Sequence, residues 1–558
     1  MSIWSTIATK IREIIKAMIG AKTVEKTLHV TPVISSQMES AITLWSVMYK
    51  NQAPWLNEPS NMNPVRVTSL GLPSMIASEK ARTALLEFKS QITTPIKLVE
   101  VENEDYTEPQ KDELGNIIPT ATPKMITEER PIGNPDRAEF LESQYKKLKR
   151  KLRKEIEYGI AKGGLVIKPY YVFNKLNDDP TLKAVPEIEF DFVQADAFYP
   201  LAFDATGKII EAAFIQTKIE KDTTYRKLEY HKLEGNSVTV VNKAYKSMNN
   251  AVNTDMMDID LGEEIPLTDV IEWQYLQPSV VIKNVTKPLF AYFRMPEANT
   301  VDTASPLGVS GYSRAVNLIK DADMQYSRLL WEYEAGEMAV NVDRDAFKFM
   351  EDKDGSYHTV LGTMQERLYR RVDVTQDEMF EPYAPLLRDI NYNAGLNTIL
   401  MRIEDVCGIS RGTLSDGAAE ARTATELKIL RQRSYQTNAD IQNAIEDALR
   451  DVVYIMNVYC DLYKITAPGD YEISFEWDDS IITDVDEELM KRLSLLSNGL
   501  TSKLETRMWY FGETERQAQE ALIKIQEESI QYAEQDLILQ SNEVTGVDKD
   551  TSGANELG

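Results

Sequence analysis

The sequence predicts a mixed α+β protein that is rich in helix and contains several domains. Two helical segments flank a mixed segment between residues 305 and 407, and a much longer helical pattern follows them. Short alternating strands dominate residues 163–273 and supply the β component. With 558 residues, 43% of them hydrophobic and 27% charged, the chain has room for about three or four domains around sizeable cores.

The first expected element is an amphipathic helix at residues 2–19. Its apolar face consists of Ile3, Trp4, Ile7, Ile11, Ile14, Ile15 and Met18. The polar face is small and only mildly basic, so we expect this helix to dock on the protein body or on a neighbouring subunit rather than on a membrane surface. A second helix is expected near residues 74–90, and the polar segment 100–130 predicts two strands joined by a turn at 112–116.

A basic helix is expected after Asn134. Its apolar residues recur at helical spacing and should point inward: Leu141, Tyr145, Leu148, Leu152 and Ile156. Basic residues crowd its other faces: Lys146, Lys147, Lys149, Arg150, Lys151, Arg153 and Lys154. This patch is either a surface for phosphate or an acidic partner, or a solvated face that pairs with acidic neighbours. The acidic net charge of the chain favours the second interpretation.

An antiparallel sheet domain is expected next, because short apolar and β-branched runs alternate with polar turns. The expected strands are residues 165–172, 187–192, 209–217, 224–232 and 237–243. The acidic stretch 247–264 is expected to be an exposed loop.

The second half of the chain alternates helices with a mixed segment. Helices are expected at residues 312–337 and 386–406, with strands and a small helix between them at 339–385. A small-residue loop with three glycines follows at 407–417 and leaves the backbone free to turn. The Thr423-x-x-Glu426 spacing of a capping box then starts a helix of about forty residues, which ends before Pro468.

The last part of the chain is expected to contain a strand, helices and a tail. Residues 471–477 alternate like a strand, and an acidic run leads into helices over 486–539. Residues 541–558 are polar and are expected to be disordered.

The order of these segments resembles the portal proteins of tailed double-stranded DNA bacteriophages, particularly siphophages of Gram-positive hosts. The resemblance covers roughly residues 130–500. It depends on the order and spacing of three short motifs: Ser305-Pro306-Leu307-Gly308-Val309-Ser310, Gly408-Ile409-Ser410 and Thr423-Ala424-Thr425-Glu426.

The resemblance implies a portal fold with wing, stem, clip and crown domains that assembles into a ring around a central channel. The implied divisions are N-terminal helices and an α/β wing at 1–304, a first stem helix at 305–338, a clip at 339–385, a second stem helix at 386–407, a tunnel loop at 408–422, a long helix with its following strand at 423–483, a crown at 484–540 and a disordered tail at 541–558.

The resemblance also implies a function and partners. Members form a homo-oligomeric ring, a dodecamer in the assembled particle, at one vertex of the capsid. Double-stranded DNA is packaged and ejected through this channel without sequence recognition. The implied protein partners are the terminase large subunit, the major capsid and scaffolding proteins, and a head-completion or adaptor protein. The implied location is the virion, after synthesis in the host cytoplasm.

Two groups of residues are candidates for contacts. The tunnel loop projects inward by resemblance, and its expected DNA-facing residues are Arg411, Thr413, Ser415 and Asp416. In the clip, Arg367, Arg370 and Arg371 are expected either to contact an acidic partner or to form intersubunit salt bridges. The link before the long helix looks short for a tunnel loop of this family.

Charge and chemistry favour a conduit over an enzyme. Subtracting 88 acidic from 62 basic residues gives a net charge of −26, which argues against wrapping nucleic acid but suits a passage through which a duplex slides. Two cysteines and three histidines show no spacing for a disulfide scaffold or a zinc site, and no P-loop is present. We therefore expect no catalytic residue, cofactor or metal site.

The sequence predicts neither a membrane span nor a secretion signal, because it contains no long apolar run and no cleavage site after a short apolar region. Three alternatives remain open: a different multimeric virion scaffold, a metal-dependent nuclease that uses scattered carboxylates, and a peripheral membrane scaffold that binds lipid through its N-terminal helix.

Overall fold

The structure is a computed structural model in which the chain forms two compact units, Met1–Trp477 and Asp478–Gly558. The described residues are 27–28, 32–57, 67–86, 88–102, 125–132, 134–172, 186–248, 261–343, 348–351, 357–360, 369–372, 380–416, 424–477, 485–513, 517–519 and 521–525. The expected helix at 2–19 and the tail at 541–558 lie outside these residues.

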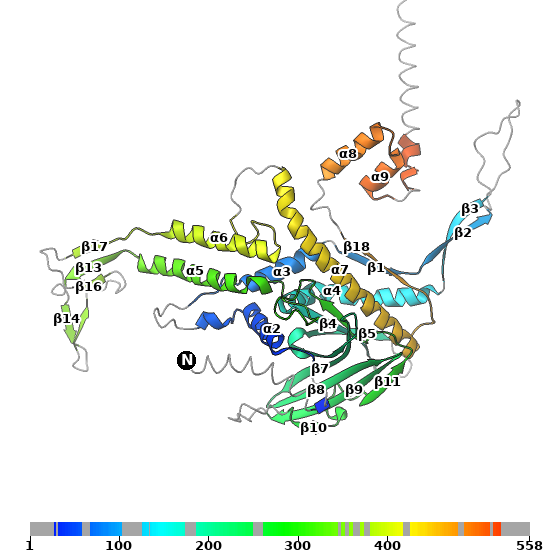
Figure 1. Ribbon diagram of the computed structural model, residues 1–558, viewed down its shortest axis with the longest axis horizontal. Helices are drawn as coiled ribbons and strands as arrows, with labels where there is room; N and C mark the ends of the chain where they lie inside the picture. Colours follow the sequence, from blue (N-terminus) through cyan, green and yellow to red (C-terminus); the bar gives the residue numbers. More distant parts are fainter. Residues whose placement is uncertain are drawn as a thin grey trace, which may run out of the picture. The chain divides into compact units, whose positions relative to one another are not determined.

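Helix α4 (Pro135–Lys162) runs through the core of the first unit (Figure 1). Asn134 caps its start, because the Asn134 side chain accepts a hydrogen bond of 3.0 Å from the amide of Asp136. Gly163 ends the helix at φ +89°, and a Cβ there would lie 2.6 Å from the carbonyl oxygen of Gly308. The five apolar residues that were expected to point inward are all buried: Leu141, Tyr145, Leu148, Leu152 and Ile156.

Two antiparallel sheets follow α4. The smaller has the order β12-β4-β5, from Ala291–Arg294, Gly164–Val172 and Glu187–Gln194, and α4 packs against it. The larger has the order β10-β9-β8-β7-β6 with β11 also on β9; its strands are β6 (Phe198–Phe203), β7 (Ile209–Glu220), β8 (Thr223–Glu234), β9 (Ser237–Met248), β10 (Glu263–Ile265) and β11 (Ser279–Lys283).

All five strands that the sequence predicted in this region are confirmed. The expected loop at 247–264 is wrong at both ends, because β9 extends to Met248 and β10 begins at Glu263 and pairs with β9. Only two residues of β9 and two of β10 fall within this stretch, which is too few for an alternation of apolar and polar residues to predict a strand.

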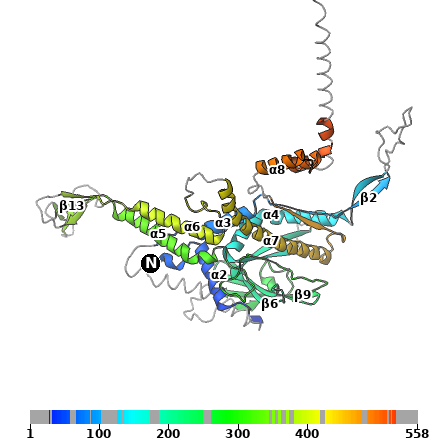
Figure 2. The ribbon, with the colours of Figure 1, turned by 45° about the horizontal axis from the view of Figure 1, so that its top comes forward.

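Helices α5 (Val316–Ala335) and α6 (Asp389–Cys407) lie side by side in Figures 1 and 2, which confirms both expected helices. Between them are five short strands: β13 (Ala339–Asp343), β14 (Lys348–Glu351), β15 (Tyr357–Val360), β16 (Tyr369–Val372) and β17 (Phe380–Tyr383). Strand β13 pairs with β16 in parallel and with β17 antiparallel. The described residues of this segment are strands and connections, and the small helix expected with them is not found there.

The long helix expected after the small-residue loop is α7 (Ala424–Leu462), which has 39 residues. Its second half is buried through Ile441, Ile445, Ala448, Leu449, Val452, Val453, Ile455, Met456 and Cys460. It packs against β4, β12 and α3 (Leu72–Ala84). Near its end, the buried Arg137 donates to the side chains of Asn457 at 2.6 Å and Asp461 at 2.8 Å.

This unit also contains α2 (Ser36–Tyr49) and two further strand pairs. Strand β1 (Lys89–Thr93) pairs with β18 (Glu472–Glu476), and β2 (Ile96–Glu102) pairs with β3 (Met125–Pro131). The helix expected at 74–90 corresponds to α3, which ends at Ala84, and the expectation is wrong for residues 89–90 because they lie in β1, where exposed and buried residues alternate as in a strand.

The second unit contains α8 (Val485–Ser497) and α9 (Lys503–Phe511). Ser502 and Glu505 form a capping box at the start of α9. These two helices confirm part of the helical segment expected at 486–539. None of the described helices combines the length and apolar character that crossing a bilayer requires.

Candidate functional site

The loop after α6 is organised around the carboxylate of Glu404, which has no exposed surface. Gly408 ends α6 in the left-handed region at φ +68°, so the chain turns back toward the helix. The carboxylate then accepts hydrogen bonds from the amides of Gly412 at 3.3 Å, Leu414 at 2.5 Å and Ser415 at 2.9 Å. The Ser415 hydroxyl adds a fourth, at 2.7 Å. Such charge-assisted bonds compensate the burial of a carboxylate and fix the path of the loop.

Three of the four candidate loop residues are exposed and the fourth is buried. The Arg411 guanidinium makes a two-pronged contact with Asp405, at 3.0 Å to Oδ1 and 2.7 Å to Oδ2. Thr413 and Asp416 are also exposed. Ser415 is only 8% exposed, and its hydroxyl holds the loop to Glu404. Residues 417–423 lie outside the described part of the chain.

Two of the three candidate arginines between α5 and α6 lie in strand β16 (Tyr369–Val372). Arg370 and Arg371 lie in this strand, opposite Asn341 and Val342 of β13 in the backbone register. Arg367 lies outside the described residues. The structure therefore locates the backbone of two of the three arginines in the three-stranded sheet β16-β13-β17.

An ion pair that sequence reasoning missed joins α5 to α6 at the end from which the short strands emerge. The Arg388 guanidinium donates to Glu332 at 3.0 Å and 2.7 Å, and the Arg388 amide donates to the same carboxylate at 3.1 Å. The two residues are 56 positions apart, so no local pattern connects them. Apolar side chains at this end are strongly exposed, including Leu386 at 94%, Ile390 at 79% and Met338 at 64%.

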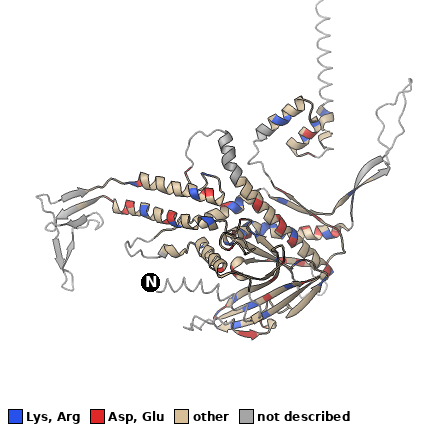
Figure 3. Cartoon of the chain, viewed as in Figure 1, with Lys and Arg blue, Asp and Glu red and all other residues tan. Residues whose placement is uncertain are grey.

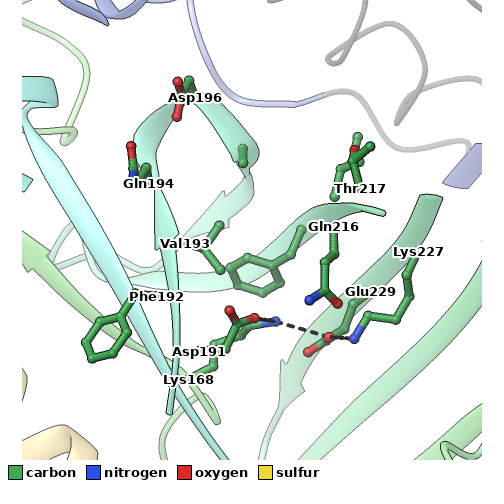
Figure 4. Close-up of a pocket in the computed structure, with 13 residues that line it drawn as sticks. Lys168, Asp191, Phe192, Val193, Gln194, Asp196, Gln216, Thr217, Lys227 and Glu229 are labelled. Carbon is green, nitrogen blue, oxygen red and sulfur yellow. Dashed lines mark ion pairs between the residues drawn. The ribbon is translucent and has the colours of Figure 1, made fainter. Parts of the chain in front are cut away.

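A buried group of charged side chains connects the two sheets (Figure 4). The carboxylate of Glu229 contacts the Lys168 amine at 3.1 Å, the Lys227 amine at 3.0 Å and the His231 ring at 2.7 Å. Asp191 lies 3.4 Å from the Lys168 amine, beside a cavity of about 260 Å³. With a neutral His231, two amines balance two carboxylates, so the group holds β4, β5 and β8 together and carries no excess charge.

The protonation of this group follows from its burial. Burial by itself raises the pKa of the Glu229 carboxyl, but attraction from Lys168 and Lys227 and the hydrogen bond with His231 bring that pKa well below its ordinary value. Burial lowers the pKa of His231, and the Glu229 carboxylate offsets this only in part. Near neutral pH the Glu229 carboxylate is therefore charged and the His231 ring beside it is neutral.

The basic face of α4 carries several ion pairs within the chain. Lys147 pairs with Glu187, Lys151 with Glu189 at 3.6 Å, and Lys149 with Glu142 at 3.6 Å. Basic and acidic positions are interspersed over the described chain in Figure 3. The expectation that lysines of this helix pair with acidic neighbours is thus confirmed for these three.

Comparison with known protein families matches residues 142–535 to the family described as Phage portal protein, SPP1 Gp6-like. No curated protein matches the chain. The family match spans α5, α6, the Glu404 loop and α7, together with both sheets, and covers well over half of the 558 residues. The chain therefore belongs to the SPP1 Gp6-like family of phage portal proteins, structural virion proteins that form the capsid-vertex channel for DNA packaging and are not enzymes.

Proposed function

We propose that α5 and α6 are the stem of a dodecameric ring and that the loop at residues 408–422 touches the DNA in the channel. One observation carries this proposal: the buried Glu404 fixes the base of the loop and leaves Arg411, Thr413 and Asp416 exposed. A loop fixed in this way presents the same groups from every subunit of a ring. The buried Ser415 contributes by holding the loop.

The charges of the loop suit sliding rather than clamping. Arg411 is already paired with Asp405, so a DNA phosphate has to compete with a carboxylate for the guanidinium. Asp416 adds an exposed negative charge nearby. Each subunit then makes a weak contact that any phosphate of the duplex can form. A ring of such contacts positions the duplex without recognising its sequence.

Neighbouring subunits cover the exposed apolar end of the helix pair in this proposal. Leu386, Ile390 and Met338 are each more than 60% exposed in the single chain. Burying such side chains stabilises an assembly by about 25 cal/mol per Å² of apolar surface removed from water. A ring gives every subunit a partner on each side, which covers this surface around the whole circle.

The other proposed domains are those that the resemblance to portal proteins implies. Residues 1–304 form the N-terminal helices and the α/β wing, and 339–385 form the clip that meets the terminase large subunit and later the head-completion or adaptor protein. Arg367, Arg370 and Arg371 are the proposed clip contacts. Residues 484–540 form the crown, and the major capsid and scaffolding proteins meet the ring at the vertex. The chain is made in the host cytoplasm and ends in the virion.

The test combines microscopy with packaging. Negative-stain electron microscopy of the purified protein should show rings with an axial hole. Rings of Arg411→Glu should form equally well but retain less packaged DNA, because the substitution adds negative charge where phosphates pass. Lys283→Glu, at an exposed residue of strand β11 outside the loop, makes the same change of two charges and is the control. Unchanged DNA retention by R411E particles contradicts the role of the loop.

A further inference from the structure

We propose that the exposed face of α4 is a second contact for double-stranded DNA, separate from the loop after α6, and that Arg150 and Arg153 bind its phosphates. The proposal rests on the charge and geometry of α4 in a protein whose family packages DNA. It does not depend on the role proposed for Arg411.

Helix α4 carries one continuous basic face. Lys146, Arg150, Arg153 and Lys154 lie at i, i+4, i+7 and i+8, so they share one side of the helix over about 12 Å of its length. Lys146 is 64% and Lys154 69% exposed, and both arginines are exposed. Residues 143–154 include no acidic residue; Glu142 just before them is buried, and Glu155 just after them is half-buried.

The basic residues of α4 differ in whether they form ion pairs within the chain. Lys147, Lys149 and Lys151 pair with carboxylates of the same chain, and the more exposed Lys146 and Lys154 make longer pairs with Glu142 at 3.9 Å and Glu155 at 3.8 Å. Within the described part of the protein, Arg150 and Arg153 have no carboxylate within ion-pair distance. Two guanidinium groups therefore remain available, one helical turn apart.

Duplex DNA fits the two guanidinium groups of α4 that are free within the described residues. Guanidinium binds phosphate through two parallel hydrogen bonds, which a lysine amine cannot form. A duplex offers a continuous row of unpaired charges, about one per 1.7 Å of its axis. The glutamates on the adjoining strand, Glu187 and Glu189, already pair with Lys147 and Lys151, so they do not neutralise the two arginines. Charge complementarity thus favours DNA.

Closed circular duplex DNA separates this contact from the channel, because a circle has no end to thread through a ring. Purified wild-type rings should bind relaxed closed circles, with an affinity that falls as salt is added. The double variant Arg150→Ala/Arg153→Ala should bind the circles at least about tenfold more weakly, and the slope of log K against log salt should shrink by about 0.9 for each arginine.

Lys151→Ala is the matched control on the same helix. Lys151 is 53% exposed and pairs with Glu189, so its removal should leave the binding of circles close to that of the wild type. Alanine is the strongest helix former, so these exposed substitutions preserve α4. The Arg411→Glu ring should also keep its affinity for circles, which makes failure here distinguishable from failure of the channel loop.

Three outcomes overturn the proposal. Wild-type rings that do not bind closed circles show that DNA meets the protein only through the channel. Equal binding by wild type and R150A/R153A shows that the two arginines are only solvated. Loss of ring assembly in R150A/R153A, but not in K151A, assigns this face to the contact between copies.

Discussion

The hydroxyl of Ser415 donates a 2.7 Å hydrogen bond to the carboxylate of Glu404, which is completely buried at the end of α6. The partners are eleven positions apart in the chain and lie on either side of the turn at Gly408. This bond links the helix proposed for the stem to the loop proposed for the channel.

Removing this bond should loosen the loop without unfolding the protein. Ser415→Ala deletes one of the four hydrogen bonds and should lower the free energy of unfolding by about 1–3 kcal/mol. Glu404→Gln should cost more, because a neutral amide accepts fewer of the same donors and brings donors of its own. Chemical denaturation measures both. Thr413→Ala, on an exposed residue of the same loop, is the control, and a larger loss for T413A than for S415A contradicts the assignment.

Asp405 should limit how strongly Arg411 holds DNA. Asp405→Ala leaves the exposed guanidinium unpaired, so rings of this variant should bind linear duplex more tightly at low salt and translocate it more slowly. Single-turnover packaging assays measure the rate of translocation. Asp405→Glu keeps the charge and should behave like wild type. Faster translocation in D405A indicates that Arg411 does not contact the duplex.

The protein should lose stability in two steps as the solution is acidified. His231 has a folded pKa below 6.5, so the unfolded chain binds its proton more readily and stability declines as pH falls below 6.5. Glu229 has a folded pKa well below 4.5, so a second decline begins below 4.5. Melting temperatures measured from pH 7 to pH 3 should show the first step and the second decline.

His231→Gln keeps a hydrogen-bond donor toward Glu229 but does not titrate. This variant should therefore lack the first decline and keep the second. If H231Q and wild type lose the same stability between pH 6.5 and pH 5, the first step belongs to another group.

Both cysteines should be unreactive in the folded protein. Burial raises the pKa of Cys407 to about 12 and that of Cys460 to about 11, so neither thiol ionises near neutral pH. A thiol reagent such as iodoacetamide should modify neither cysteine at pH 8 until denaturant is added, and mass spectrometry counts the modified sites. Rapid labelling of Cys407 in native protein means that the core around the end of α6 opens.

The sequence predicted most reliably what depends on neighbouring residues. The inward face of α4 and the length of α7 follow from apolar residues at helical spacing, and both are confirmed. The loop residues Arg411, Thr413, Ser415 and Asp416 are expected to face DNA from the resemblance to portal proteins, but the burial of Ser415 depends on the turn at Gly408 and on Glu404.

What the sequence did not predict depends on contacts between distant positions. Strand β1 forms because β18 lies beside it, although nearly 400 residues separate the two. The pairing of Glu332 with Arg388, and the group around Glu229, likewise require the folded arrangement. The local periodicity of the sequence does not predict pairings between residues that are far apart in the chain.

The pairing of β13 with β17 has a consequence for how portal proteins diverge. Ala339 lies opposite Tyr383, so the segment between α5 and α6 leaves and re-enters the helix pair at a single point. Together with the Glu332–Arg388 contact, this pairing holds the two ends of the segment close together. Insertions or replacements inside it can therefore leave the spacing of α5 and α6 unchanged, so that, with the clip and stem roles proposed above, partner contacts can vary while the helix pair keeps its geometry.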